Sequence, residues 1–254
     1  MKGSDVMSHN FFDNEQLFDK YINMRTDKQN DTDKIERPAI FSLLPNNFNN
    51  LTILDVCCGY GQMTKFFADN GAKLVIGIDI SQKMINKAKK DNNHKNIRYI
   101  CNDVKNINAE SKGKYDLIYS SASFHFIDDL DLLFKKFYTL LKEGGKLVFS
   151  MQHPIMTANH ENPQWTMDEL GNPQYYNFKD YFSEGFKEGK WFSKEITAGS
   201  YHRQISTIIN DLSNNNFFIE KMLEPAPKPN QFDEKIYKLL LFRPSTVVFR
   251  CSKK

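Results

Sequence analysis

The stretch Leu51–Gln62, LTILDVCCGYGQ, decides the fold. It opens with a short apolar run, which predicts a buried strand with Asp55 near its end. Gly59 and Gly61 follow, and glycine is needed where the backbone adopts a positive φ or approaches a ligand closely. A helix through Phe66 comes next. The stretch therefore predicts a strand, a tight turn and a helix whose first N–H groups face the turn.

Outward from this stretch, apolar runs and helical patterns alternate. The predicted strands are 51–56, 74–78, 97–101, 117–120, 146–150, 217–222 and 246–251. This alternation is typical of an α/β, doubly wound, Rossmann-like fold: a mostly parallel seven-stranded sheet with helices on both faces. Before the first strand, Asp13 is expected to begin a helix, with Gln16 completing a capping box.

The alternation stops after Ser150. Residues 152–201 hold prolines, glycines and many aromatic side chains, with ten aromatics between Trp165 and Tyr201, about twice the density that the chain average of 13% gives. We interpret residues 152–204 as a lid inserted after the fifth strand, over the edge of the sheet where that strand ends. An aromatic cluster that merely packs on the domain would explain the same composition.

The composition is that of an ordinary globular protein, with 40% hydrophobic and 26% charged residues. The net charge of +3 is spread along the chain, so we predict no nucleic-acid partner, which would need a basic face. No apolar run approaches the about 20 residues of a membrane span, and the N-terminus lacks the apolar core of a signal peptide. Four cysteines without metal-ligand spacing predict reduced thiols, no metal site and a cytoplasmic protein.

Acidic residues mark the ends of the first three strands. Asp55 ends the first, Asp79 ends the second twenty residues after Gly59, and Asp103 follows the third. Parallel strands bring such ends to one edge, where ligands bind in sheets of this class. Asp79 can accept hydrogen bonds from both hydroxyls of a ribose, and Asp103 can accept one from an adenine amino group. The pattern predicts a nucleoside site, although Asp79 could instead cap the helix that follows it.

Several segments resemble the successive motifs of class I S-adenosylmethionine-dependent methyltransferases: ILDVCCGYG, GIDIS, CNDV and KEGGKLVFS, within about residues 50–151. Others resemble a subgroup of bacterial small-molecule enzymes, of methyltransferase type 11: FFDNEQLFDKYINMR, LVFSMQHPIMTA and YHRQISTIINDL. The resemblance implies transfer of a methyl group from S-adenosylmethionine to a small-molecule acceptor, with S-adenosylhomocysteine as the second product.

The resemblance also assigns roles to residues. In that family the first aspartate and the glycines hold the methionine end of the cofactor, the second acid holds the ribose, and the third region holds the adenine. The matching positions are Asp55, Gly59, Gly61, Asp79, Asp103 and Val104. Tyr21 and Arg25 match an aromatic residue and an arginine that approach the cofactor in related enzymes. Neighbouring residues complete the predicted cofactor site: Cys57, Ile80, Met84 and Ser120.

A base is needed only if the acceptor atom must lose a proton. His125 after the fourth strand and His153 after the fifth are the catalytic candidates, since both are expected at the ligand edge of the sheet. A structural role for each is the alternative. In the lid, Tyr181, Trp191 and His202 are expected to contact the substrate.

The chain is expected to divide into four parts. Residues 1–50 form a helical segment over the cofactor site, residues 51–151 form the cofactor-binding core, residues 152–204 form the lid, and residues 205–254 supply the last helix and two strands of the core.

Two other functions stay open. A nicotinamide-dependent oxidoreductase would share the sheet and Asp79. It would need a third glycine where Thr64 stands, however, and Asp55 would repel its pyrophosphate. A non-catalytic protein that binds S-adenosylmethionine would share all of these motifs.

Overall fold

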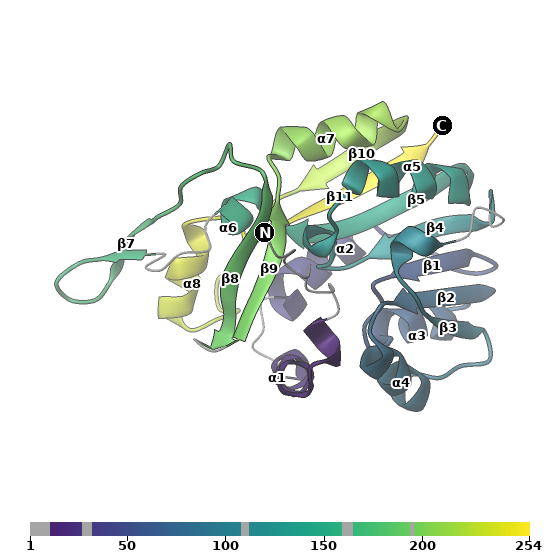
Figure 1. The fold of residues 1–254 in the computed structure, drawn as a ribbon, viewed down its shortest axis with the longest axis horizontal. Coiled ribbons are helices and arrows are strands. Elements are labelled where there is room, and N and C mark those ends of the chain that lie inside the picture. Colours follow the sequence, from purple (N-terminus) through teal and green to yellow (C-terminus); the bar gives the residue numbers. More distant parts are fainter. Residues whose placement is uncertain (1–10, 27–31, 108–111, 159–164, 194–195) are drawn as a thin grey trace, which may run out of the picture.

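A seven-stranded sheet forms the centre of the molecule, in the order β10-β11-β5-β4-β1-β2-β3 (Figure 1). The computed structural model describes residues 11–26, 32–107, 112–158, 165–193 and 196–254. The strands are β1 (Thr52–Val56), β2 (Leu74–Asp79), β3 (Ile97–Cys101), β4 (Tyr115–Ser120), β5 (Leu141–Gln152), β10 (Phe217–Leu223) and β11 (Thr246–Lys253). Strands β1 to β5 pair in parallel, whereas β11 is antiparallel to β5 and β10. The predicted seven-stranded, mostly parallel sheet is confirmed.

Helices pack against the sheet between its strands (Figure 1). They are α2 (Arg37–Phe41), α3 (Gln62–Asp69), α4 (Gln82–Asp91), α5 (Leu130–Leu140) and α7 (Ile205–Asn214). The chain passes from strand to helix to the next parallel strand, which is the connection that gives a doubly wound, Rossmann-like sheet.

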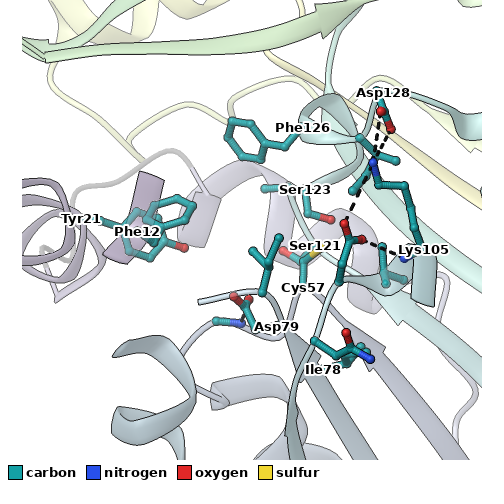
Figure 2. Close-up of a pocket in the computed structure, with 17 residues that line it drawn as sticks. Phe12, Tyr21, Cys57, Ile78, Asp79, Lys105, Ser121, Ser123, Phe126 and Asp128 are labelled. Atoms are coloured by element: carbon teal, nitrogen blue, oxygen red, sulfur yellow. Dashed lines mark hydrogen bonds and ion pairs between the residues drawn. The ribbon is translucent and has the colours of Figure 1, made fainter. Parts of the chain in front are cut away.

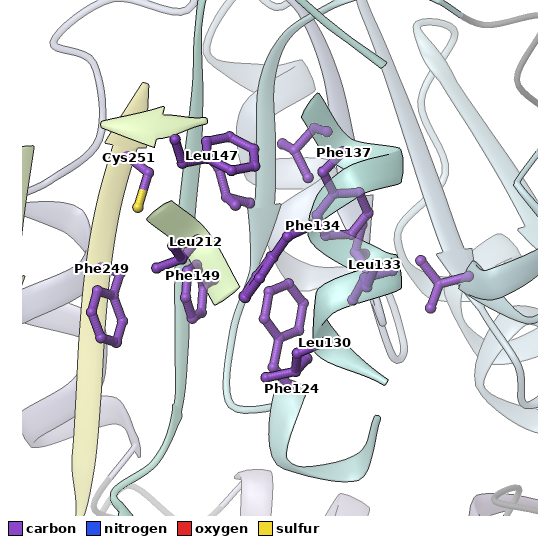
Figure 3. Packing of buried hydrophobic residues seen from close by; sticks show 14 of the residues in the cluster. Phe124, Leu130, Leu133, Phe134, Phe137, Leu147, Phe149, Leu212, Phe249 and Cys251 are labelled. Atoms are coloured by element: carbon purple, nitrogen blue, oxygen red, sulfur yellow. The ribbon is translucent and has the colours of Figure 1, made fainter. Parts of the chain in front are cut away.

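Apolar residues alternate between the two faces of the sheet because successive side chains of a strand point in opposite directions. Leu54, Ile118 and Phe149 lie in the cluster under α5 and α7 (Figure 3). Their neighbours Ile53 and Leu117 lie in the cluster on the other face, with residues of α2 and α3. All five are at most 1% exposed, and full burial of such a side chain contributes about 1.5–3 kcal/mol.

The N-terminal helix α1 (Glu15–Thr26) begins differently from the prediction. Its capping residue is Asn14, whose Oδ1 accepts the N–H of Leu17 at 3.2 Å. The expected capping residue, Asp13, instead accepts hydrogen bonds from the Ser81 hydroxyl at 2.6 Å and the N–H of Lys83 at 3.1 Å. Sequence spacing alone could not show this because the partners lie about 70 positions away. Asp13 thus ties the N-terminal segment to the start of α4.

A group of short elements lies between β5 and α7, to the left of the sheet in Figure 1. They are α6 (Pro154–Ala158), β6 (Trp165–Met167), β7 (Pro173–Tyr176), β8 (Gly185–Ser193) and β9 (Ile196–His202). The strands form two antiparallel hairpins, β6–β7 and β8–β9.

Helix α8 (Glu234–Leu241) lies between β10 and β11 and was not predicted. Asp233 caps it by accepting the N–H of Ile236 at 2.9 Å. The sequence does carry this signal, an aspartate before an apolar repeat. Among all described residues, no helix has the length and apolar content needed to cross a bilayer.

Candidate functional site

Three adjoining cavities lie where β1, β2 and β4 end. The strand-end cavity runs from Asp79 to Asp128 and, counted together with its open mouth, encloses about 840 Å³. The turn cavity lies over the Cys57–Tyr60 turn, and the Glu36 cavity lies between α1, Glu36 and the end of β5. Tyr21 and Ser121 line all three cavities. A ligand that filled them would therefore bend around these two side chains.

The strand-end cavity contains seven of the predicted cofactor residues (Figure 2). They are Tyr21, Cys57, Gly59, Asp79, Ile80, Asp103 and Val104. They come from α1, the turn after β1, the end of β2 and the residues after β3. The structure thus brings together the strand ends that the sequence pointed to.

Asp79 organises this cavity. Its Oδ2 accepts the N–H of Gly59 at 2.8 Å, and its Oδ1 accepts the N–H of Ser81 at 2.9 Å. The carboxyl is 8% exposed, and burial raises its pKa, against the effect of these backbone bonds. A backbone hydrogen bond from Ile80 acts on the pKa in the same direction as these bonds. A carboxylate has about four acceptor sites, so Asp79 can order the turn and the start of α4 and still accept a hydrogen bond from a ligand.

Charged side chains close the far end of the strand-end cavity (Figure 2). Lys105 lies 3.0 Å from Oδ1 of Asp128 and 4.0 Å from Oδ2 of Asp103. Burial acts to raise the pKa of Asp128, but the hydrogen bond and charge of Lys105 outweigh it and lower that pKa. Asp103 also accepts the N–H of Lys105 at 2.8 Å. Arg203 stabilises this end of the cavity by donating hydrogen bonds to the backbone carbonyls of Ile127 and Asp128.

Asp55 lines the turn cavity from the end of β1. It is 2% exposed, and its Oδ2 accepts a hydrogen bond from the Thr64 hydroxyl at 2.5 Å. Burial raises the pKa of Asp55 to about 7. Thr64 occupies the position of the third glycine of a dinucleotide site. The helix still approaches the sheet closely because Gly77 in β2 leaves room, since a Cβ there would lie 3.0 Å from the Thr64 hydroxyl.

The glycines of the turn serve different purposes. Both have a positive φ, +53° at Gly59 and +84° at Gly61. A Cβ at Gly59 would meet no atom within 4 Å, so this glycine faces open space in the cavity. A Cβ at Gly61 would lie 2.3 Å from the hydroxyl of Tyr99. Gly61 is therefore required for packing and lines none of the three cavities.

Met84 and Ser120, two other predicted cofactor residues, also lie behind the cavity walls. Met84 is 1% exposed in the buried face of α4. Ser120 donates to the carbonyl of Val56 at 2.7 Å and shares a hydrogen bond with the Ser123 hydroxyl at 2.5 Å. Ser120 thereby positions Ser123, which lines the strand-end cavity, whereas Met84 packs in the core.

Tyr21 and Arg25 project from α1 into the region where the cavities meet. Burial raises the pKa of Tyr21 to about 12, so its hydroxyl remains a donor at neutral pH. Arg25 lines both the turn cavity and the Glu36 cavity, and its side chain is 10% exposed. Its guanidinium lies 3.6 Å from Asp33, and its buried Nε has no hydrogen-bond partner among the residues that the structure describes. Such a donor is costly unless a ligand accepts from it.

The two candidate catalytic histidines lie in different surroundings. His125 lines the Glu36 cavity, and its Nδ1 accepts the N–H of Gln152 at 3.3 Å. In the neutral ring, this bond leaves the proton on Nε2. His153 lines none of the three cavities: its Nε2 hydrogen-bonds Glu224 at 2.7 Å, and its Nδ1 accepts the N–H of Ile155 at 3.1 Å. His153 thus orders the start of α6.

The described lid residues expected at the substrate do not line these cavities either. His202 is fully buried, with hydrogen bonds to the Thr157 hydroxyl at 2.9 Å and the carbonyl of Tyr181 at 2.8 Å. The Tyr181 hydroxyl accepts the N–H of Ile205 at 3.3 Å. The side chain of Trp191 lies outside the described residues. These hydrogen bonds tie the segment together, and a substrate role for the three residues stays a prediction.

Sequence reasoning missed Glu36, which is 4% exposed and ends the π-helical turn Thr32–Glu36. Its Oε1 accepts hydrogen bonds from the hydroxyls of Ser121 at 2.8 Å and Ser150 at 2.5 Å. Burial raises the pKa of Glu36, and these two bonds act in the opposite direction. No motif or spacing marks Glu36, since its partners lie 85 and 114 positions away.

Comparisons with known proteins identify the family to which this chain is similar. The family described as "Methyltransferase domain" matches residues 54–149. A protein from Listeria monocytogenes described as an S-adenosylmethionine-dependent methyltransferase is 32% identical, with a TM-score of 0.79 over 86% of this chain and 96% of its own. The corresponding Mesorhizobium loti enzyme is 30% identical, with a TM-score of 0.76 over 85% and 97%. Malonyl-[acyl-carrier protein] O-methyltransferase 1 of Ilyobacter polytropus is 30% identical over 85% of this chain and 71% of its own.

Proposed function

Because this chain belongs to the S-adenosylmethionine-dependent methyltransferases, we propose that it holds the cofactor across the strand-end and turn cavities and methylates a small molecule in the Glu36 cavity. The observation that carries this assignment is that Tyr21 and Ser121 line all three cavities. A cofactor bent at that point would place its sulfur where the third cavity opens.

The strand-end cavity suits the adenosine half of the cofactor. Asp79 faces the cavity and can accept a hydrogen bond from a ribose hydroxyl, and Asp103 lies beside Val104 where the adenine ring would sit. Phe12 and Phe126 line the same space, with their ring centroids 6.3 Å apart. Apolar walls with a few oriented polar groups are typical of a nucleoside site.

The turn cavity suits the methionine half. Asp55 supplies a carboxylate for an ammonium group, and the buried Nε of Arg25 is a donor for a carboxylate. The open space beside Gly59 allows the backbone to approach a ligand. The turn cavity therefore offers one group of each charge to the two charged ends of the methionine half.

The methyl group of the bound cofactor is electrophilic because it is attached to a positively charged sulfur. The task of the protein is then to align the acceptor and to exclude water. The rings of Tyr21 and Phe12 pack edge to face with their centroids 4.9 Å apart, which places apolar surface beside the junction of the cavities. The Tyr21 hydroxyl stays protonated and can donate a hydrogen bond there.

The names of the relatives differ in the acceptor or pathway that they give: malonyl-[acyl-carrier protein], phosphoethanolamine and ubiquinone biosynthesis. For this chain we infer a small-molecule acceptor and no nucleic-acid substrate, supported by the net charge of +3. A cytoplasmic location is supported by four cysteines that are all free thiols. Residues 1–50 would cover the cofactor, and residues 152–204 would stand beside the acceptor.

Calorimetry with S-adenosylmethionine, S-adenosylhomocysteine, NAD and NADP tests this function. We expect the first two to bind and the nicotinamide cofactors not to bind, because Asp55 opposes a pyrophosphate and Thr64 replaces the third glycine. Binding of NAD or NADP alone would overturn the assignment. Binding of S-adenosylmethionine without methyl transfer to any small molecule would favour the non-catalytic alternative.

A further inference from the structure

The Glu36 cavity contains a carboxylate whose chemistry the proposed function does not yet use. Glu36 is the only carboxylate among the described residues that line this cavity. Both of its hydrogen bonds reach one oxygen, Oε1, from the hydroxyls of Ser121 and Ser150. The other oxygen, Oε2, receives no hydrogen bond from the described residues. When Glu36 is ionised, Oε2 can therefore accept a hydrogen bond from a ligand in the cavity.

The other polar groups of the cavity do not fill this role. His125 uses Nδ1 to accept the N–H of Gln152, which leaves its second nitrogen a donor. Arg25 is a donor only, and the Tyr21 hydroxyl stays protonated. Glu36 is therefore the group in this cavity that is equipped to accept a proton.

We propose that Glu36 is the proton acceptor for methyl transfer and that it selects acceptors whose nucleophilic atom carries a hydrogen, an amine or a hydroxyl. This rests on the proposed function, since it places the acceptor in the Glu36 cavity. A carboxylate acceptor is disfavoured, because its charge would meet that of Glu36, which is only 4% exposed. The chain would then differ from its relatives that are named for a malonyl acceptor.

The step balances with groups already named. Oε2 of Glu36 takes the proton of the N–H or O–H as the electron pair of that atom forms the new bond to the methyl carbon. The electrons of the broken carbon–sulfur bond stay on sulfur, which gives S-adenosylhomocysteine. Glu36 is left as a neutral acid and returns its proton to solvent. The hydroxyls of Ser121 and Ser150 hold Oε1 throughout and so keep Oε2 directed to the acceptor.

Matched probes test this selection on protein saturated with S-adenosylhomocysteine. One set is aniline, phenol and benzoate, and the open-chain set is butylamine, butanol and butyrate. By NMR titration we expect the amine or hydroxyl member to bind at least about tenfold more tightly than its carboxylate counterpart, the effect of one hydrogen bond to a charged group. Whether the amine or the hydroxyl member binds better tells which atom is methylated.

Two variants test the role of the carboxylate. Glu36→Gln keeps the shape and an oxygen for the two serines but places an amide donor in the cavity, so we expect the amine and hydroxyl probes to lose about tenfold in affinity. For any probe that wild type methylates, transfer should fall about 10²- to 10⁴-fold. Glu36→Asp keeps the charge but withdraws it from the cavity, so we expect the amine and hydroxyl probes to bind more weakly to this variant as well. Glu220→Gln, which removes the same charge from β10 outside the three cavities, is the matched control.

Affinity for S-adenosylhomocysteine separates the possible failures. If wild type does not bind it, the proposed function fails as a whole. If wild type binds it, the inference about Glu36 is overturned by carboxylate probes that bind as tightly as the donors, or by an absence of binding from every probe. Donor probes that bind the cofactor-competent Glu36→Gln protein unchanged would also overturn it. The comparison of probes on wild type needs no variant and holds even if a substitution impairs folding.

Discussion

The turn after β1 and the segment after β5 both leave strands at the same edge of the sheet, but they use their polar side chains in opposite ways. Asp79 bonds backbone N–H groups at Gly59 and Ser81 and still faces a cavity. In the segment after β5, both ring nitrogens of His153 and of His202 form hydrogen bonds within the protein, and neither residue lines any of the three cavities.

The difference follows from what holds each region in place. In the turn, backbone N–H groups and positive-φ glycines fix the shape, so side chains are free for a ligand. In the inserted segment, no described residue of 153–204 belongs to either of the two buried apolar clusters. Its histidines are instead held by hydrogen bonds, His153 to Glu224 and His202 to Thr157. Position at the ligand edge is therefore insufficient to identify a functional residue; the free hydrogen-bonding capacity of its side chain must also be counted.

The largest effect is expected for Gly61→Ala, which tests whether the turn is set by its backbone. A left-handed φ costs a non-glycine residue about 1–2 kcal/mol, and the clash with Tyr99 adds about 1–3 kcal/mol. We expect the free energy of unfolding to fall by about 2–5 kcal/mol in urea titrations. Gly59→Ala is the control: it should lose only the φ contribution in stability but weaken cofactor binding, because its methyl group enters the cavity. Equal stability losses for both would contradict this division.

Asp79→Ala should weaken binding of S-adenosylmethionine by about 1.5–3 kcal/mol, the contribution of hydrogen bonds to a charged group. Calorimetry measures it. Asp79→Asn, which keeps one acceptor oxygen, should lose less. An unchanged affinity in Asp79→Ala would mean that Asp79 only orders the start of α4. Its side chain would then have a structural role alone, like the histidines of the inserted segment.

The pH dependence of cofactor binding tests Asp55. Its pKa is about 7 in the free protein, and an ammonium partner favours the ionised form, so binding lowers that pKa. Affinity for S-adenosylhomocysteine should then fall as pH drops below about 7, by up to about tenfold, or 1.4 kcal/mol, per pH unit. Asp55→Asn should remove this dependence. If wild type and variant have the same pH profile between pH 5 and 8, Asp55 does not contact the ammonium group.

The smallest effects on the cofactor are expected in the inserted segment. His153→Ala and Tyr181→Ala should change affinity for S-adenosylhomocysteine by less than about 0.5 kcal/mol, while the melting temperature falls because packing and hydrogen bonds are lost. Trp191→Ala should leave affinity equally unchanged but lower methyl transfer, because Trp191 is expected to contact the substrate. A weaker cofactor complex in any of the three would show that the segment reaches the cofactor after all.

By itself, the sequence determined the sheet, its parallel core and the strand ends that form the strand-end cavity. Strand alternation, glycine turns and acids at strand ends are local patterns, and a parallel sheet brings its strand ends together whatever the loops do. Some predicted cofactor residues, such as Gly61 and Met84, belong to the same motifs but line none of the three cavities. Their side-chain directions depend on neighbours such as Tyr99, which the motif does not contain.

Only the tertiary structure decided which carboxylate and which histidine line the Glu36 cavity. Glu36 gains its place from Ser121 and Ser150, and His125 is held by Gln152 while His153, one residue further on from Gln152, turns away to Glu224. The physical reason is that a buried polar side chain goes where its hydrogen-bond partners are, and those partners come from segments 27 to 114 positions away. No local pattern encodes distances of that kind.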